Sequence, residues 1–181
     1  MPRLTDGQIA VIKQNIEYML NMRKYSLTDT TVHDTNQIYM DFINSDQVLL
    51  RVVLFLFPAE ILLPSDKILN TLVKNWPHAL LFVTSKLPTV GQIAKIPAGT
   101  ELRLYSDFKI NPFKGPYSAQ SDTVVSFDDI RSVYYTSPDN MPTMLMTDPV
   151  AVWLGVKRGD IVVSSIPTKA VPYRIVYRCV R

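Results

Sequence analysis

Apolar side chains recur at helical spacing close to the start of the chain. Thr5 and Gln8 have the spacing of a capping box, and Leu4 and Ile9 have that of the matching hydrophobic staple. The apolar positions that follow fall on one face of a helix: Ile9, Ile12, Ile16 and Met19. This pattern predicts an amphipathic helix over residues 5–23 that packs against a core.

Apolar runs in the first half of the chain predict strands. Residues 37–43 and 78–84 are two such runs, and residues 48–57 are apolar on both faces, as in a central strand covered by helices. Residues 65–76 have a helical pattern and lie between the strands predicted at 48–57 and 78–84. This order predicts a parallel strand–helix–strand unit. The polar, Thr- and Asp-rich residues 25–35 predict a loop.

Loop-forming residues become frequent after residue 106. Residues 101–106 alternate in polarity and predict a strand, whereas residues 107–122 contain an Asn-Pro step, a Gly-Pro step and a polar run. We therefore expect an N-terminal domain of residues 1–106 and a C-terminal domain of residues 107–181.

Two helix signals stand out in the C-terminal domain. Ser126 is a suitable N-cap and is followed by two aspartates in the first turn, where the helix dipole favours them. Asp148 and Pro149 suit the N-cap and first position of a second short helix, and Gly155 suits its left-handed end. The sequence therefore predicts two short, well-capped helices.

The chain ends in a predicted strand pair. Residues 157–160 predict a tight turn, and residues 161–166 and 171–180 predict the two strands after it. Alternate residues of the last strand share one face: Tyr173, Ile175, Tyr177 and Cys179. We expect Tyr173, Tyr177 and Cys179 on this face to lie in the core. The order of elements predicts an α+β fold, with an N-terminal α/β domain followed by a small mixed α/β domain.

Charge argues against independent nucleic-acid binding. The 181-residue chain has a formal charge of +3, with 9 basic and 8 acidic groups in residues 1–98 and 10 and 8 in residues 99–181. Binding to phosphates requires a dense basic patch. Any contact with DNA should therefore be weak and made together with other proteins.

Composition also bears on metal sites and on membranes. Cys179 is the single cysteine, and His33 and His78 are isolated, so we expect no disulfide, metal site or cofactor. The longest apolar run reaches about half a membrane span, and the N-terminus has no apolar signal segment. We expect an intracellular protein without a membrane segment.

One short motif leaves an enzymatic alternative open. Asp107-Phe108-Lys109 follows a predicted strand and has the acid-x-Lys pattern of Mg²⁺-dependent nucleases. The upstream acid would be Glu60 or Asp66. A third interpretation is a free-standing interaction module.

Several C-terminal motifs together resemble one known family. In order they are Thr147–Ala151 (Thr-Asp-Pro-Val-Ala), Leu154-Gly155, the turn Lys157–Asp160, and the closing Tyr177-Arg178. This ungapped register resembles the fifth-subunit family of eukaryotic and viral DNA-directed RNA polymerases, a family that also has a shorter archaeal homologue.

The chain also departs from that family. Residues 108–114 keep the proline of the family's His-Glu-Leu-x-Pro-x-His element but neither histidine, and Ile166 replaces an arginine. Residues 172–174 read Pro-Tyr-Arg where the family has Gly-Arg-Tyr. These changes suggest a divergent polymerase, such as that of a large DNA virus.

The resemblance implies a non-catalytic polymerase subunit in the nucleus, or in a virion or viral factory. Its C-terminal domain would dock on the largest subunit, and its N-terminal domain would form part of the jaw near downstream DNA. The implied contacts with the largest subunit are Asp148, Pro149, Val150, Trp153, Lys157, Arg158, Tyr177 and Arg178, with Gly155 and Gly159 forming turns. A loop with Lys86, Pro88 and Thr89 would face the DNA.

Overall fold

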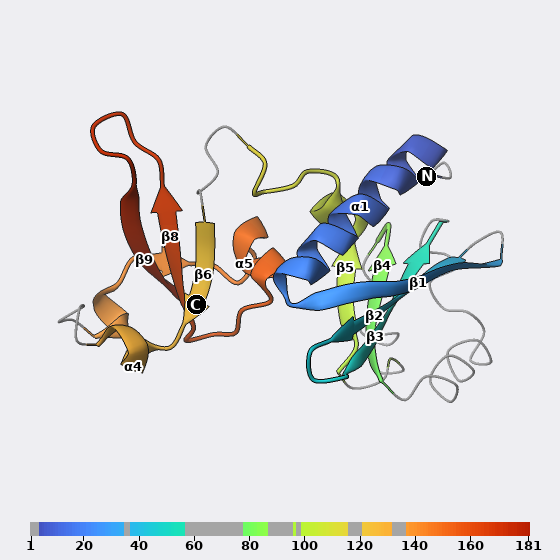
Figure 1. Ribbon diagram of the computed structural model, residues 1–181, viewed down its shortest axis with the longest axis horizontal. Helices are drawn as coiled ribbons and strands as arrows, with labels where there is room; N and C mark the ends of the chain where they lie inside the picture. Colours follow the sequence, from blue (N-terminus) through green and yellow to red (C-terminus); the bar gives the residue numbers. More distant parts are fainter. Residues whose placement is uncertain are drawn as a thin grey trace. The chain divides into compact units, whose positions relative to one another are not determined.

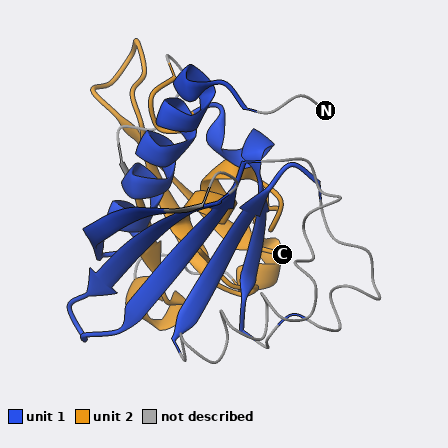
Figure 2. Cartoon of the chain, turned by 90° about the vertical axis from the view of Figure 1, so that its right-hand side faces the viewer, with its two compact units in different colours: residues 1–110 blue, residues 111–181 orange. Residues whose placement is uncertain are grey.

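The computed structural model divides the chain into two compact units, residues 1–110 and residues 111–181 (Figure 2). The residues that the structure describes are 4–34, 37–56, 78–86, 96, 99–115, 121–131 and 137–181. Helices and two mixed sheets confirm the α+β class. Within the described residues, no helix has the length and apolar character needed to cross a membrane.

In the described residues of the first unit, one α-helix accompanies a five-stranded sheet (Figure 1). Its sheet order is β1-β2-β3-β4-β5, antiparallel from β1 to β3 and parallel from β3 to β5. The elements are α1 (Asp6–Met22), β1 (Tyr25–Asp34), β2 (Gln37–Asn44), β3 (Leu49–Phe55), β4 (Ala79–Thr84) and β5 (Glu101–Leu104).

Helix α1 forms for the reasons that the sequence indicates. Thr5 Oγ1 accepts a hydrogen bond from the Gln8 backbone N–H at 3.3 Å, and the Gln8 side chain accepts one from the Thr5 N–H at 3.0 Å. Ile12, Ile16 and Met19 are buried, so the predicted apolar face does pack against a core. The helix prediction is confirmed.

The prediction of a loop over residues 25–35 is wrong. Strand β1 spans most of this segment and pairs antiparallel with β2, with register irregularities between Leu27 and Asp29 and between Val32 and Asp34. Residues 28–32 are exposed, so no alternation of apolar and polar side chains marks this strand in the sequence. Its β-branched threonines suit an edge strand whose stability comes from pairing rather than burial.

Strand β3 is central, as its sequence predicts. Val52, Val53 and Leu54 are completely buried, and the strand pairs in parallel with β4. On the neighbouring strand, Asp41 pairs with Arg51 in register, and their side chains meet at 2.7 Å. The predicted helix over residues 65–76 lies outside the described residues.

The first unit extends beyond the predicted domain boundary. After β5, a 3₁₀ turn at Tyr105–Phe108 packs into the unit, with Phe108 fully buried and its carbonyl accepting a 2.7 Å hydrogen bond from Asn15 Nδ2. Burial raises the pKa of Tyr105 to about 12. These contacts explain why this unit ends at residue 110 rather than 106; the domain division itself stays a prediction.

The second unit contains a four-stranded sheet of order β6-β8-β9-β7. Strand β7 is parallel to β9, and the other pairs are antiparallel. The elements are β6 (Ser121–Val125), α4 (Phe127–Ile130), a 3₁₀ turn (Pro138–Asn140), β7 (Thr143–Met144), α5 (Pro149–Leu154), β8 (Ile161–Ile166) and β9 (Arg174–Val180).

Both faces of the second sheet contribute to apolar clusters. One cluster joins Val162 and Val180 of the sheet to α5 through Ala151. The other joins Ile161 and Cys179 to Ile130 of α4 and to Met141. The sheet is therefore covered on both sides near the end of β9, and α5 is held firmly against one side.

Candidate functional site

The predicted caps hold α5 and the turn after it in place. Asp148 Oδ1 accepts from the Val150 N–H at 2.8 Å, Pro149 occupies the first turn, and Gly155 ends the helix in the left-handed region at φ 67°. Asp160 Oδ2 then accepts from the Lys157 N–H at 2.7 Å. The helix and turn predictions are confirmed.

The turn is also fastened to the last strand. The Gly159 N–H donates to the Val180 carbonyl at 2.9 Å, and the Val180 N–H donates to the Asp160 carbonyl at 2.9 Å. Gly159 has φ 96°, which a residue with a side chain rarely adopts. The backbone of the turn is therefore well defined, although its side chains face solvent.

Two cations lie on this defined turn. Lys157 and Arg158 are both exposed, and neither makes an ion pair within the described part of the chain. Their ammonium and guanidinium groups can bind carboxylates of another molecule. Of the other predicted contacts nearby, Pro149 is exposed and Val150 is half-buried.

Trp153 is a core residue rather than a surface contact. Its side chain is fully buried, and its ring centroid lies 6.1 Å from that of Phe113. A partner cannot reach this ring in the folded unit, so its predicted direct contact is corrected. The resemblance could not show that this six-residue helix packs its indole inward.

Arg178 takes part in a polar network inside the second unit. Its Nη2 donates to Ser164 Oγ at 2.6 Å and lies 3.8 Å from Asp122 Oδ1, and the Ser164 hydroxyl donates to the same carboxylate. The Asp122 side chain is only 2% exposed. This network gives Arg178 a structural role within the second unit, and its predicted contact with the largest subunit stays a prediction.

The predicted core face of the last strand is buried only at its end. Cys179 is buried and Tyr177 packs half-buried against the same cluster, whereas Tyr173 and Ile175 are 55% and 50% exposed. The core prediction is wrong for Tyr173, and Ile175 on the same face is exposed as well. Strand alternation identifies a face of the sheet, but it cannot show where the covering elements stop.

Sequence reasoning missed two exposed apolar residues beside the turn. Leu145 and Met146 are 61% and 43% exposed. The Met146 N–H donates to the Arg181 carbonyl at 3.1 Å, which places this pair next to the end of β9. The signal was a run of three apolar residues at 144–146, of which a two-residue strand buries only Met144.

The nuclease motif has a structural explanation. The Asp107 carboxylate accepts from the Leu104 N–H at 3.1 Å and from the Ser106 hydroxyl at 3.3 Å, which caps the 3₁₀ turn. Glu60 and Asp66 lie outside the described residues, and no group of metal-binding side chains occurs among those described. The nuclease alternative is therefore not favoured.

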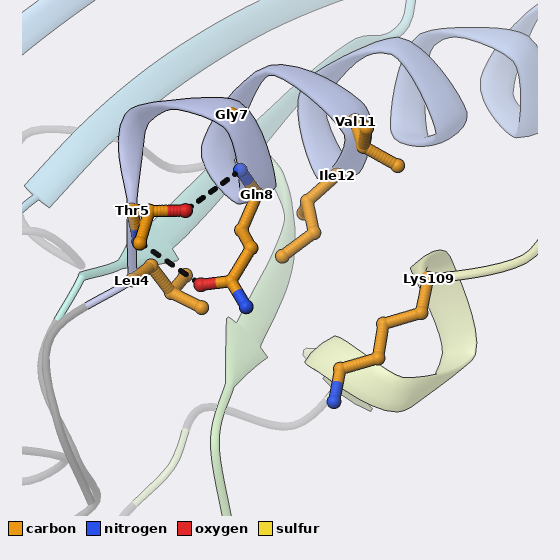
Figure 3. A pocket seen from close by; sticks show the side chains of 7 residues that line it. All are labelled: Leu4, Thr5, Gly7, Gln8, Val11, Ile12 and Lys109. Carbon is orange, nitrogen blue, oxygen red and sulfur yellow. Dashed lines mark hydrogen bonds between the residues drawn. The ribbon is translucent and has the colours of Figure 1, made fainter.

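A cavity of about 450 Å³ lies beside the start of α1 (Figure 3). Thr5 and Gln8 line it, but their polar atoms are used in the capping box. Its other lining residues are Leu4, Gly7, Val11, Ile12 and Lys109. One lysine among apolar side chains provides no acid–base pair for catalysis.

The remaining predicted positions add little to a site. His78 and Lys86 are exposed, while Pro88 and Thr89 lie outside the described residues, as does the side chain of His33. The predicted DNA-facing loop therefore stays a prediction.

The described geometry of the second unit is that of a small α+β domain with two exposed cations on a hydrogen-bonded turn. Residues 120–180 match the family model described as RNA polymerase Rpb5, C-terminal domain. This segment makes up most of the second unit, and its match supports the Rpb5-like family of RNA polymerase subunits. No curated protein matches the chain significantly.

Proposed function

We propose that the chain is a non-catalytic structural subunit of a multisubunit DNA-dependent RNA polymerase. Its second unit docks on the largest subunit, where the nucleotidyltransferase chemistry is carried out with the other large subunit. The observation that carries this proposal is the family match over residues 120–180. The exposed cations of the Lys157–Asp160 turn lie within that match and support a docking role.

The docking surface combines charge with apolar area. Lys157 and Arg158 offer donors to carboxylates, and Leu145 and Met146 offer exposed apolar side chains near the same end of β9. Interfaces commonly surround an apolar centre with a polar rim. We expect the largest subunit to present an apolar pocket bordered by acidic residues.

The first unit acts as part of the jaw near downstream DNA, by resemblance to the family. Its nearly balanced charge supports a weak contact that depends on the rest of the complex. Lys86, just after β4, is the exposed described cation of the proposed DNA-facing loop. The protein would act in the nucleus, or in a virion or viral factory.

Affinity purification from the native source tests this proposal directly. We would tag the chain, purify it at low salt, and quantify co-purifying proteins by mass spectrometry. Recovery of the two large polymerase subunits in equal amounts with the chain is expected. A stable chain that is recovered without polymerase subunits would contradict the proposal and favour a free-standing module.

A further inference from the structure

The tip of the β8–β9 hairpin presents apolar side chains to solvent. Val171, Tyr173 and Ile175 occupy alternating positions and are 50%, 55% and 50% exposed. We call these three residues the hairpin strip. Ile175 lies opposite Ser165 in the strand register, two pairs beyond the partly buried Tyr177 and Val163, and therefore on the same face.

Ile175 of the hairpin strip lies in β9, on a face of the sheet that is buried further along, and Val171 and Tyr173 directly precede the strand. On β9, Cys179 is 3% exposed beneath the cluster with Ile130 and Met141, and Tyr177 packs at the edge of that cluster. Past Tyr177, nothing in the described residues covers the face to a comparable degree. Exposed apolar residues that lie together, rather than scattered singly, are typical of a surface that binds a partner.

The hairpin tip is also held in a defined conformation. The Thr168 hydroxyl donates to the Val171 carbonyl at 2.8 Å and accepts from the Val171 N–H at 3.1 Å. Pro167 and Pro172 flank this reciprocal pair and restrict the backbone further. Little conformational entropy would be lost when a partner binds a tip of this kind.

Charge indicates what kind of partner fits. Residues 161–181 contain four basic side chains, Lys169, Arg174, Arg178 and Arg181, and no acidic one. Arg178 is hydrogen-bonded to Ser164 and forms an ion pair with Asp122, and Arg181 forms an ion pair with Asp139 at 2.8 Å. Lys169 and Arg174 are exposed and make no ion pair within the described part of the chain.

We infer that the hairpin strip binds an acidic protein segment that carries apolar side chains, contributed by another polymerase subunit. Tyr173 and Ile175 supply the apolar contact, and Lys169 pairs with a carboxylate of the segment. Arg174 alternates with Ile175 and lies on the other face of β9, where its positive charge attracts the segment without a direct pair. Two free cations are too few for a phosphate backbone, and two of the three strip residues are aliphatic, which favours protein over nucleic acid. The inference rests on the proposed function.

Photocrosslinking inside the polymerase tests the inference. The full chain, tagged and expressed in its native source, would carry a benzophenone amino acid at position 173, and crosslinked peptides would be identified by mass spectrometry. Crosslinkers at Val32, which is 68% exposed in the first unit, and at Lys157 serve as comparisons. The expected product joins position 173 to an acidic segment of another polymerase subunit.

Paired variants measure the strength of the contact. Tyr173→Ser with Ile175→Ser should lower the crosslinking yield of a probe at Val171 about tenfold, as for loss of a central interface contact. Val32→Ser with Ile110→Ser removes two exposed apolar side chains from the first unit and should leave the yield unchanged. Lys169→Glu with Arg174→Glu should also lower the crosslinking yield, and the decrease should be larger at low salt than at high salt.

Each other outcome overturns the inference. A product at position 173 with DNA, RNA or a second copy of this chain assigns the strip to a different occupant. A chain that enters the polymerase and crosslinks at position 157 but not at position 173 removes the strip as a docking surface and leaves the proposed function standing. Failure to recover any polymerase subunit removes both.

Discussion

Glu101 shows how a few side chains hold the first unit together. Its carboxylate accepts from Arg23 Nη1 at 2.7 Å, from Arg23 Nη2 at 3.1 Å and from Arg103 Nε at 2.8 Å. Burial by itself raises the pKa of Glu101, but the hydrogen bonds and positive charges of the two arginines outweigh burial, and the pKa is lowered. The triad ties the end of α1 to β5.

Glu101→Gln should destabilise the first unit by about 1–3 kcal/mol at neutral pH, because hydrogen bonds to a charged group are lost. The lowered pKa means that the unfolded chain binds more protons, so the carboxylate's contribution is full above a pH of about 4.3. It disappears as the pH falls through the lower folded-state pKa. Urea unfolding of the native chain and the variant, at pH values from about 3 to about 7, checks both points.

Glu17→Gln is the control for this experiment, since Glu17 is half-buried and makes no ion pair within the described residues. Its free energy of unfolding should change by less than about 0.5 kcal/mol. If the two variants lost stability equally and with the same pH dependence, the triad would have no special role.

Arg178 belongs to the structural network of the second unit. Asp122→Asn removes the negative charge that its guanidinium faces, so we expect a loss of about 1–3 kcal/mol, reduced from the cost for a fully buried pair because Arg178 is 26% exposed. A double-mutant cycle with Arg178→Met should show coupling between the two residues. Additive losses in denaturant unfolding would mean that the two side chains do not act together.

Substitution of Lys157 and Arg158 should affect incorporation into the polymerase, whereas substitution of Trp153 should affect stability. Charge reversal of both cations should leave the free energy of unfolding within about 0.5 kcal/mol, because both side chains are exposed, yet weaken incorporation into the polymerase. Trp153→Ala should cost about 3–5 kcal/mol of stability because it empties a fully buried site. Unfolding curves and co-purification yields together separate the two effects.

Helix α5 depends on its ends because it has only six residues. Isolated helices of this length do not form in water, so capping and packing must stabilise it. Asp148 provides the N-terminal bond, and Gly155 allows the left-handed end at φ 67°. The same positions give the family its recognisable sequence, which links a local folding requirement to the motif.

Asp148→Ala should cost about 1 kcal/mol of unit stability, and Gly155→Ala about 1–2 kcal/mol because alanine is strained in the left-handed region. Thermal unfolding followed by circular dichroism would measure both losses. Thr147→Ala changes an exposed neighbour without a cap bond and serves as the control. A loss as large at Thr147 as at Asp148 would show that the cap bond is not the cause.

The edge strand β1 illustrates how an element can be hidden from sequence reasoning. Its residues 28–32 are exposed, so neither period 2 nor an apolar run marks it. Pairing with β2 satisfies its backbone, and that pairing depends on a neighbouring strand rather than on its own side chains. Helix α1, by contrast, carries its cap and its apolar face within one segment.

The whole chain consists of two units with separate cores. The two apolar clusters of the second unit use residues from 125 to 180 alone. Residues 111–181 expressed by themselves should therefore fold cooperatively, although with the modest stability of a small domain. A single dispersed amide spectrum and a sigmoidal urea curve would support this; a molten, non-cooperative curve would contradict it.

Local interactions account for what could be read directly from the amino-acid order. Helix caps, turn glycines, β3 and the family motifs each depend on neighbouring residues or on simple periodicity, so they were predictable. The burial of Trp153, the Asp122–Arg178 network and the exposure of Tyr173 and Ile175 depend on which distant segments pack together. Their positions follow from long-range packing in the folded chain, which no local pattern encodes.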